Sequence, residues 1–157
     1  MTDGASAEPF TVGPVLVLTG SDPAQKIAFH DSVPIGSALR LFGAVSPASP
    51  WATNYFRWSN NPWNVVEPEG QNNAGDWTTD DQARLRAVVN VAHGSGLWIR
   101  FYTLNGHPPE DGERQGWSPG YNFGSIEAAR IRWRAAIDAG ADFIATDQYE
   151  DFAMSAR

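Results

Sequence analysis

The feature that most constrains the fold is an alternation of short apolar segments with segments that carry helix-start and helix-end signals. The apolar segments are rich in β-branched and aromatic residues: 14–20, 39–45, 54–59, 97–104 and 141–147. Continuous apolar runs of this kind suit parallel strands that are covered on both faces. Strands that alternate with helices are typical of βα units. The sequence therefore predicts an α/β fold with a mostly parallel sheet.

Two helices are expected between the first four strand segments, at 21–31 and 78–96. In the first, Asp22 is the expected N-cap and Pro23 occupies the first helical position. In the second, Thr79 and Gln82 have the spacing of a capping box.

A third helix is expected at 124–140 and carries the strongest signals. Ser125 is the expected N-cap and Gly140 the expected end. Three arginines are expected to lie largely outside its apolar face: Arg130, Arg132 and Arg134.

The strand segment 97–104 carries a cation in its middle. Because side chains alternate along a strand, Trp98, Arg100 and Tyr102 share one side. The other side, which is mostly apolar and should pack beneath a helix, holds Leu97, Ile99, Phe101 and Thr103. We expect the first side to face the interior of a barrel or a crevice. An unpaired buried guanidinium is very unfavourable, so Arg100 requires an anionic partner.

A second strand segment, 54–59, repeats this combination, because Tyr55 and Arg57 share one side. Asp147, at the end of the last strand segment, is a natural ion-pair partner for either arginine. Two interpretations stay open: a closed Arg–Asp network that stabilises the barrel mouth, or a site where a planar guanidinium binds a ligand phosphate or carboxylate. The second interpretation predicts these substrate-binding residues: Tyr55, Arg57, Trp98, Arg100, Tyr102 and Asp147.

Composition argues against several classes of protein. A net charge of −7 over 157 residues disfavours general nucleic-acid binding, which needs a basic surface. The absence of cysteine excludes a disulfide framework and a thiolate metal site. No apolar run approaches the roughly 20 residues of a transmembrane helix, so no such segment is expected. Residues 1–13 lack the pattern of a signal peptide and are expected to form a flexible lead-in before one domain at 14–157.

The segments PVLVLTGSDPAQK, WIRFYTLNG and, above all, AAIDAGADFIATDQYEDF resemble the carboxyl-terminal half of phosphatidylinositol-specific phospholipase C-like phosphodiesterases, of the glycerophosphodiester phosphodiesterase superfamily. The resemblance covers about residues 14–152, with the Arg100 segment similar to the seventh barrel strand and Thr146–Asp147 similar to the end of the eighth. It implies a TIM (β/α)₈ barrel, hydrolysis of phosphoric diesters of the lipid or glycerophosphodiester type, and a Ca²⁺ or Mg²⁺ ion. Relatives of this family are often secreted, but the chain itself predicts no cellular compartment.

The chain departs from this family in length and in its catalytic residues. A complete barrel takes about 250 residues, and the histidines and acidic metal ligands of the family's amino-terminal strands have no counterpart here. We therefore expect an incomplete TIM-barrel-like domain with long strand-to-helix loops, in which no catalytic residue and no metal ligand is assigned. Whether the chain is an active phosphoric diester hydrolase on its own is left open. Open sheet edges predict association, as a homodimer or with a complementary half.

A carbohydrate-binding or glycoside-hydrolase-like domain with an aromatic-lined cleft is the alternative. Loops rich in tryptophan suit the stacking of sugar rings. Asp147 and Glu150 lie on one short segment, however, and flank a glycosidic bond poorly.

Overall fold

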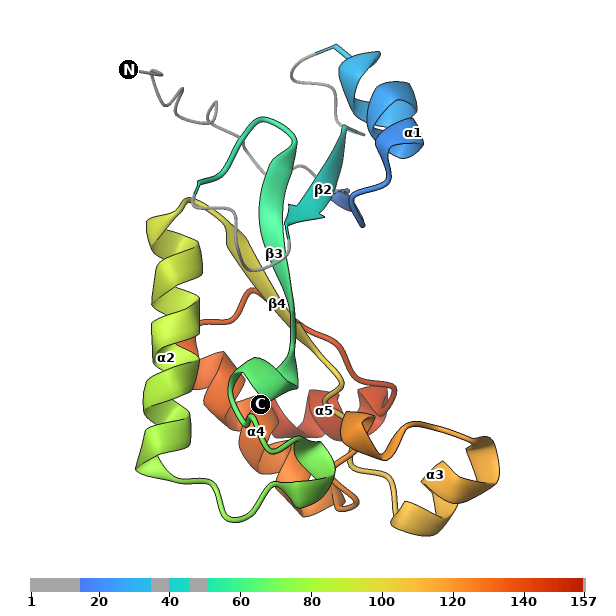
Figure 1. The fold of residues 1–157 in the computed structure, drawn as a ribbon, viewed down its shortest axis with the longest axis vertical. Coiled ribbons are helices and arrows are strands. Elements are labelled where there is room, and N and C mark those ends of the chain that lie inside the picture. Colours follow the sequence, from blue (N-terminus) through green and yellow to red (C-terminus); the bar gives the residue numbers. More distant parts are fainter. Residues whose placement is uncertain (1–14, 35–39, 46–50, 157) are drawn as a thin grey trace. The chain divides into compact units, whose positions relative to one another are not determined.

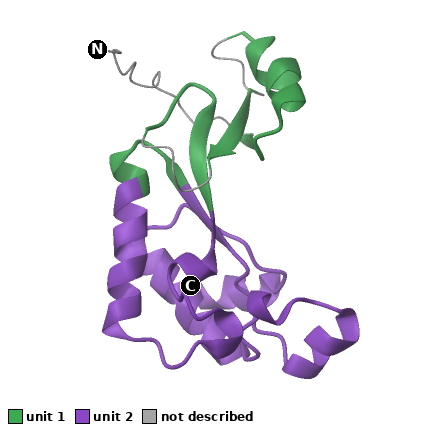
Figure 2. Cartoon of the chain, viewed as in Figure 1, with its two compact units in different colours: residues 1–60, 92–98 green, residues 61–91, 99–157 purple. Residues whose placement is uncertain are grey.

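The computed structural model describes residues 15–34, 40–45 and 51–156. The lead-in predicted for residues 1–13 lies outside the described residues. The chain is divided between two compact units (Figure 2). The first unit holds residues 1–60 and 92–98, and the second holds residues 61–91 and 99–157.

The described residues form five short strands, which make one sheet in the order of the sequence, β1-β2-β3-β4-β5 (Figure 1). They are β1 Val17–Thr19, β2 Leu41–Val45, β3 Phe56–Pro62, β4 Trp98–Tyr102 and β5 Phe143–Ile144. The ladders β1–β2, β2–β3 and β4–β5 are parallel. Parallel neighbours with helices between them are the pattern of βα units. The α/β class predicted from the sequence is therefore confirmed.

In the first unit, β1, β2 and the start of β3 surround a small apolar core. Phe42 lies opposite Leu18 in the β1–β2 ladder, and Ala44 lies opposite Trp58 in the β2–β3 ladder. The core residues Phe42, Ala44 and Trp58 are buried, and Leu16, Leu18 and Trp98 pack against them. The indole Nε1 of Trp58 donates a hydrogen bond to the Phe42 carbonyl at 3.2 Å, which satisfies the polar atom of this aromatic side chain.

Helix α1, Pro23–Lys26, follows β1 and continues into a π-helical turn, Ile27–Asp31. As predicted, Asp22 is the N-cap, and its carboxylate accepts a hydrogen bond from the Gln25 N–H at 2.8 Å. Pro23 occupies the first helical position, where its missing N–H costs nothing.

The second unit contains most of α2, Thr79–Gly94, and the remaining described helices. They are α3 Pro109–Gln115, α4 Ile126–Ala139 and α5 Tyr149–Ser155, with 3₁₀ turns at Trp63–Val65, Gln71–Asn73 and Pro119–Tyr121. The segments predicted as long loops therefore contain short helical turns. The sequence did not predict α5, and no side chain caps its start.

Helix α2 begins with a capping box one residue earlier than the sequence predicts, because Thr78 takes the role expected of Thr79. The N–H and the hydroxyl of Thr78 donate to Asp81 Oδ2 at 2.8 and 2.6 Å, and the Asp81 N–H donates back to the Thr78 hydroxyl at 3.3 Å. Gln82, the expected partner, accepts a hydrogen bond from the indole of Trp77 instead. Amides that the first helical turn leaves without partners are satisfied in this way.

Helix α4 begins and ends as predicted. The Ser125 hydroxyl accepts from the Ala128 N–H at 3.3 Å, and Gly140 ends the helix with a φ of 85°. The prediction that Arg132 lies outside the buried face is wrong. Its side chain is 2% exposed, because the carboxylate of Glu67 meets it inside the unit.

Helix α5 packs on α4 and covers part of the core of the second unit. Trp133 of α4 is fully buried, and its Nε1 donates to the Leu104 carbonyl at 2.8 Å. The ring of Phe152 meets the Trp133 ring edge-on, with 5.6 Å between the centroids. An ion pair between Arg130 and Asp151, 2.6 Å long, joins the same two helices.

The capping box of α2 leads to a pH-dependent prediction. Burial acts to raise the pKa of Asp81, but hydrogen bonds from Thr78 and the charge of Arg84 outweigh it and hold the pKa below its ordinary value of 3.8. A carboxyl with a lowered folded-state pKa stabilises the protein above its unfolded-state pKa, and this contribution is lost as the pH falls through the folded-state value. We expect Asp81→Asn to lower the free energy of unfolding by about 1 kcal/mol at neutral pH.

Urea unfolding followed by circular dichroism at a series of pH values measures this effect. The difference between Asp81→Asn and the wild type should shrink as the pH falls below about 4. Asp80→Asn, on the exposed side of the same helical turn, is the control and should cost only a few tenths of a kcal/mol. A difference that is constant at all pH values would contradict the role given to the Asp81 charge.

Candidate functional site

The residues predicted to bind a ligand are divided between the two units. Tyr55, Arg57 and Trp98 belong to the first unit, and Arg100, Tyr102 and Asp147 belong to the second.

Tyr55 is packed inside the first unit, with only 4% of its surface exposed. Its ring meets His30 edge-on at a centroid distance of 5.0 Å. A Cβ atom at Gly43 would lie 2.3 Å from the Tyr55 ring, so the ring occupies the space that the glycine leaves. Its hydroxyl is buried without a hydrogen-bond partner among the described residues, and this burial raises the pKa of the phenol. Contact between Tyr55 and a ligand stays a prediction.

Arg57 and Trp98 have different surroundings in the first unit. Arg57 is partly exposed, and its Nη2 donates to the side-chain oxygen of Asn54 at 3.3 Å. Trp98 packs against the apolar core, with its ring 6.3 Å from that of Phe42. Arg57 thus lies beside a polar amide, whereas Trp98 lies beside the apolar core.

In the second unit, β4 has one fully buried side and one partly exposed side. Ile99 and Phe101 are 0% exposed, whereas Arg100 and Tyr102 are partly exposed. This is the alternation that the sequence predicts. The guanidinium carbon of Arg100 lies 5.4 Å from the centroid of the Tyr102 ring, which is within the range of a cation–π interaction. A cation and an aromatic ring are thus held together on the less covered side of a strand.

The exit from β4 is strained. Thr103 has a φ of 66°, a left-handed conformation that a β-branched residue rarely adopts. Gln71, which is 2% exposed, fastens this turn by donating to the Thr103 carbonyl at 2.8 Å and to the Thr103 hydroxyl. Strained residues of this kind concentrate at functional sites. The sequence gives no signal for Gln71, because it lies in a segment without periodicity.

Asn105 connects the carboxyl ends of β4 and β5. Its side-chain oxygen accepts hydrogen bonds from the Thr146 hydroxyl and the Asp147 N–H, both at 2.9 Å. Its Nδ2 donates to Asp147 Oδ2 at 3.0 Å. The next N–H along the chain, that of Gly106, donates to Gln148 Oε1 at 2.6 Å. These contacts form a polar group that we call the carboxyl-end cluster, which consists of Asn105, Gly106, Thr146, Asp147 and Gln148.

The carboxyl-end cluster and the partly exposed side of β4 are the candidate functional site. In α/β proteins, ligands bind at the carboxyl ends of parallel strands. Asp147 is exposed and offers a carboxylate to a ligand, whereas Arg100 offers guanidinium donors. An ion pair of Asp147 with Arg100 or Arg57 stays a prediction.

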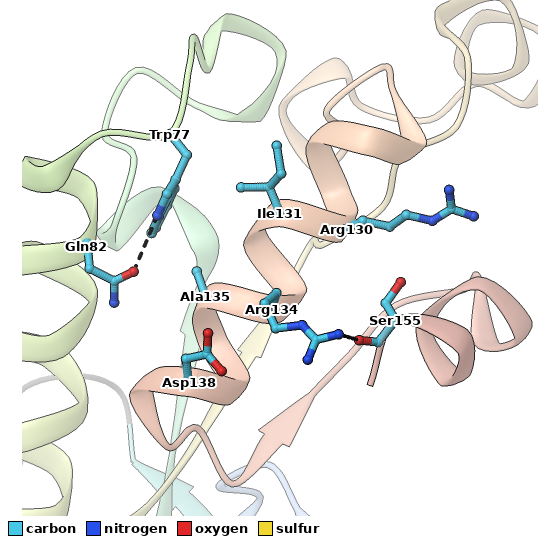
Figure 3. Close-up of a pocket in the computed structure, with 8 residues that line it drawn as sticks. All are labelled: Trp77, Gln82, Arg130, Ile131, Arg134, Ala135, Asp138 and Ser155. Atoms are coloured by element: carbon cyan, nitrogen blue, oxygen red, sulfur yellow. Dashed lines mark hydrogen bonds between the residues drawn. The ribbon is translucent and has the colours of Figure 1, made fainter. Parts of the chain in front are cut away.

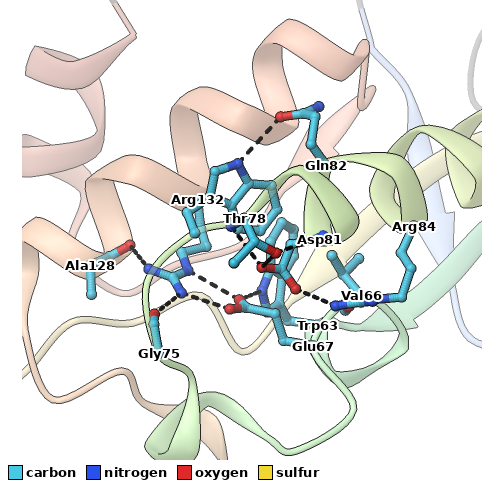
Figure 4. Close-up of polar contacts among 11 residues, drawn as sticks. Trp63, Val66, Glu67, Gly75, Thr78, Asp81, Gln82, Arg84, Ala128 and Arg132 are labelled. Carbon is cyan, nitrogen blue, oxygen red and sulfur yellow. Dashed lines mark hydrogen bonds and ion pairs between the residues drawn. The ribbon is translucent and has the colours of Figure 1, made fainter.

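A buried ion pair between Glu67 and Arg132 lies behind this site in the same unit (Figure 4). The two side chains are 5% and 2% exposed. They meet through two contacts, Nη2 to Oε1 at 2.6 Å and Nε to Oε2 at 3.0 Å. Trp63 Nε1 also donates to Glu67 at 2.6 Å, and Arg132 also donates to the Gly75 carbonyl at 2.8 Å. The pair is therefore closed by the protein and does not offer a charge to a ligand.

The second unit also has an open groove of about 470 Å³ beside α4 (Figure 3). Trp77 and Gln82 line one wall, and Ile131 and Arg134 line the other. Arg134 already donates a hydrogen bond to the Ser155 carbonyl. None of the residues predicted to bind a ligand lines this groove.

Within the described residues, no group of three or more histidine, cysteine, aspartate or glutamate side chains is arranged to hold a metal ion. The described residues therefore do not fit the Ca²⁺ or Mg²⁺ centre that the phosphodiesterase resemblance implies, and no reaction step is assigned to such an ion.

Comparisons with protein-family models, with curated proteins and with solved structures give no match. No helix in the described part of the chain is both long and apolar enough to cross a bilayer.

The buried ion pair predicts a strong dependence of stability on both partners. Arg132→Met would leave the Glu67 carboxylate buried without its cation, so we expect the free energy of unfolding to fall by about 3–5 kcal/mol. Glu67→Gln should have a similar effect, and the double variant should lose less than the sum of the two. Urea unfolding of the three variants provides the measurement.

Arg114→Met is the matched control. It removes the exposed ion pair with Asp111 on α3, and we expect it to cost at most about 1 kcal/mol. If Arg132→Met destabilised the protein no more than Arg114→Met does, the buried pair would not support the fold.

Proposed function

We propose that this chain is a phosphate-recognising domain of the phosphoric diester hydrolase type, built as the carboxyl-terminal part of a (β/α) barrel. The observation that carries the proposal is on β4, where Arg100 lies against Tyr102 on the partly exposed side while Ile99 and Phe101 are fully buried. The sequential order of the strands and the segments that resemble these phosphodiesterases support the same assignment.

The chemistry of this strand favours an anionic ligand such as a phosphodiester of the lipid or glycerophosphodiester type. A guanidinium presents a planar set of donors that matches two oxygens of a phosphate. Its hydrogen bonds to an anion are stronger on a partly desolvated surface than in water. Tyr102 limits the directions that Arg100 can adopt, which lowers the entropy lost on binding.

The chain supplies binding groups in this proposal, and no residue is assigned the role of acid, base or metal ligand. In the intact family, hydrolysis uses catalytic histidines and a divalent cation, and these come from strands that the chain lacks. We therefore infer that this chain has little hydrolytic activity by itself.

We further infer that the chain associates, either as a homodimer or with a complementary half. The described strand order ends at β1 and β5, and β1 has only three residues. End strands of a sheet leave backbone groups that another chain can pair with.

A carbohydrate-binding domain is the second candidate. Trp117 and Tyr121 are 42% and 56% exposed on the segment that follows α3, and exposed aromatic rings suit the stacking of sugars. Micromolar binding on a glycan array, together with no binding of phosphate compounds, would favour this function.

The proposed phosphate site predicts a specific loss of binding. Arg100→Gln should weaken the binding of an inositol phosphate by about tenfold or more, because a charged hydrogen bond contributes about 1.5–3 kcal/mol. Isothermal titration calorimetry measures the affinity, and circular dichroism shows whether the fold is retained.

Arg86→Gln is the control, because Arg86 is an exposed cation on α2 and should not change the affinity. Equal affinities of wild type and Arg100→Gln would contradict the proposal. Unfolding of Arg100→Gln would instead support the structural interpretation of this arginine.

Association and activity can be measured together. Multi-angle light scattering should give a mass above that of one 17.1 kDa chain, and hydrolysis of a generic phosphodiester should be negligible with or without Ca²⁺. A monomer with strong Ca²⁺-dependent turnover would overturn the proposal that the chain lacks its catalytic half.

A further inference from the structure

Asn105 and Gly106 form the one Asn–Gly dipeptide of the sequence. This dipeptide is chemically labile, because glycine has no side chain to shield its amide and its backbone reaches conformations that other residues avoid. In the reaction, the Gly106 nitrogen loses its proton and bonds to Asn105 Cγ, the Cγ–Nδ2 bond breaks, and ammonia leaves. Water then opens the cyclic imide at either carbonyl to give aspartate or isoaspartate.

The structure restrains the side chain that would be attacked. The Asn105 oxygen accepts two hydrogen bonds at 2.9 Å, from Thr146 and from the Asp147 N–H. Its Nδ2, which is the leaving group, donates to Asp147 Oδ2 at 3.0 Å. Cyclisation requires Cγ to approach the Gly106 nitrogen, so these three hydrogen bonds must break first.

The attacking nitrogen is restrained as well. The Gly106 N–H donates to Gln148 Oε1 at 2.6 Å, and this hydrogen bond opposes loss of the proton. Gly106 is buried against the start of α4, where an added Cβ would lie 2.4 Å from the Ser125 carbonyl oxygen and 2.7 Å from Ile126 Cα. The Asn105 carbonyl accepts from the Phe123 N–H at 2.8 Å, so the backbone on both sides of the reacting bond is held.

The same contacts explain why the fold keeps a labile dipeptide. Only glycine fits at position 106, because a side chain would collide with the backbone of α4. Only an amide can both accept from Thr146 and donate to Asp147 in the observed way. The reactive sequence is therefore a requirement of the packing at the carboxyl ends of β4 and β5.

We propose that Asn105 is a conformationally guarded modification site, which remains an amide while the carboxyl-end cluster is closed and converts to aspartate or isoaspartate once the cluster opens. The reaction needs water and no other reactant. This inference goes beyond the proposed phosphate binding and does not depend on it.

The product would prevent the cluster from closing again. Aspartate at position 105 lacks the donor that contacts Asp147 and brings a second carboxylate to the same oxygen, where like charges repel. Isoaspartate adds a methylene to the backbone beside the tightly packed Gly106. The modification would thus record each opening permanently.

The test measures deamidation of the purified full chain by peptide mass spectrometry during incubation at mildly alkaline pH. We expect Asn105 to react at least about tenfold more slowly in the native protein than in protein unfolded by urea, as for other reactions that require local opening. Equal rates in the native and unfolded protein would overturn the proposal. Asn105→Gln assigns the signal, because its longer side chain cannot form the five-membered imide.

A second comparison isolates the guarding contacts. Gln148→Ala removes the acceptor of the Gly106 N–H and should accelerate deamidation of the folded protein several-fold, whereas Gln115→Ala, on the exposed part of α3, should not. If Gln148→Ala does not fold, Thr146→Val removes one hydrogen bond to Asn105 and serves in its place. A folded variant of either kind that reacts no faster than the wild type would overturn the proposal.

Discussion

The buried ion pair of Glu67 and Arg132 is the interaction on which the second unit depends. Removing two charges from water costs several kcal/mol per ion, and the attraction between them compensates only when the geometry is good and the remaining polar atoms are satisfied. Both conditions hold here, because the pair makes two direct contacts and because Trp63 and Gly75 complete its hydrogen bonds. The pair therefore fixes the segment after β3 against α4.

This fixed segment also determines how β4 ends. Gln71 follows Glu67 by four residues and donates to the carbonyl and hydroxyl of Thr103. The same short stretch of chain thus makes an ion pair with α4 and holds the strained turn from which Asn105 extends. The candidate site is built on β4 and β5, but its geometry depends on a segment that contains neither strand.

Sequence reasoning succeeded where the determining contacts are local. Ser125 and Gly140 were identified as the ends of α4, and the alternation of β4 was identified, because both depend on neighbours within a few residues. It failed for Arg132, whose partner Glu67 is 65 positions away and lies in a segment without periodicity. The capping box of α2 was displaced by one residue because Thr78 and Thr79 satisfy the same spacing rule with different partners.

The left-handed backbone of Thr103 has a consequence for the direction of the chain. Without the hydrogen bonds from Gln71, Thr103 could relax to an extended conformation and the strand could continue through Leu104. Each residue beyond that point would then exchange faces, since strand side chains alternate. Asn105 would turn away from Asp147, and the polar group at the end of the sheet would not assemble. One buried glutamine therefore decides on which face of the sheet the following residues emerge.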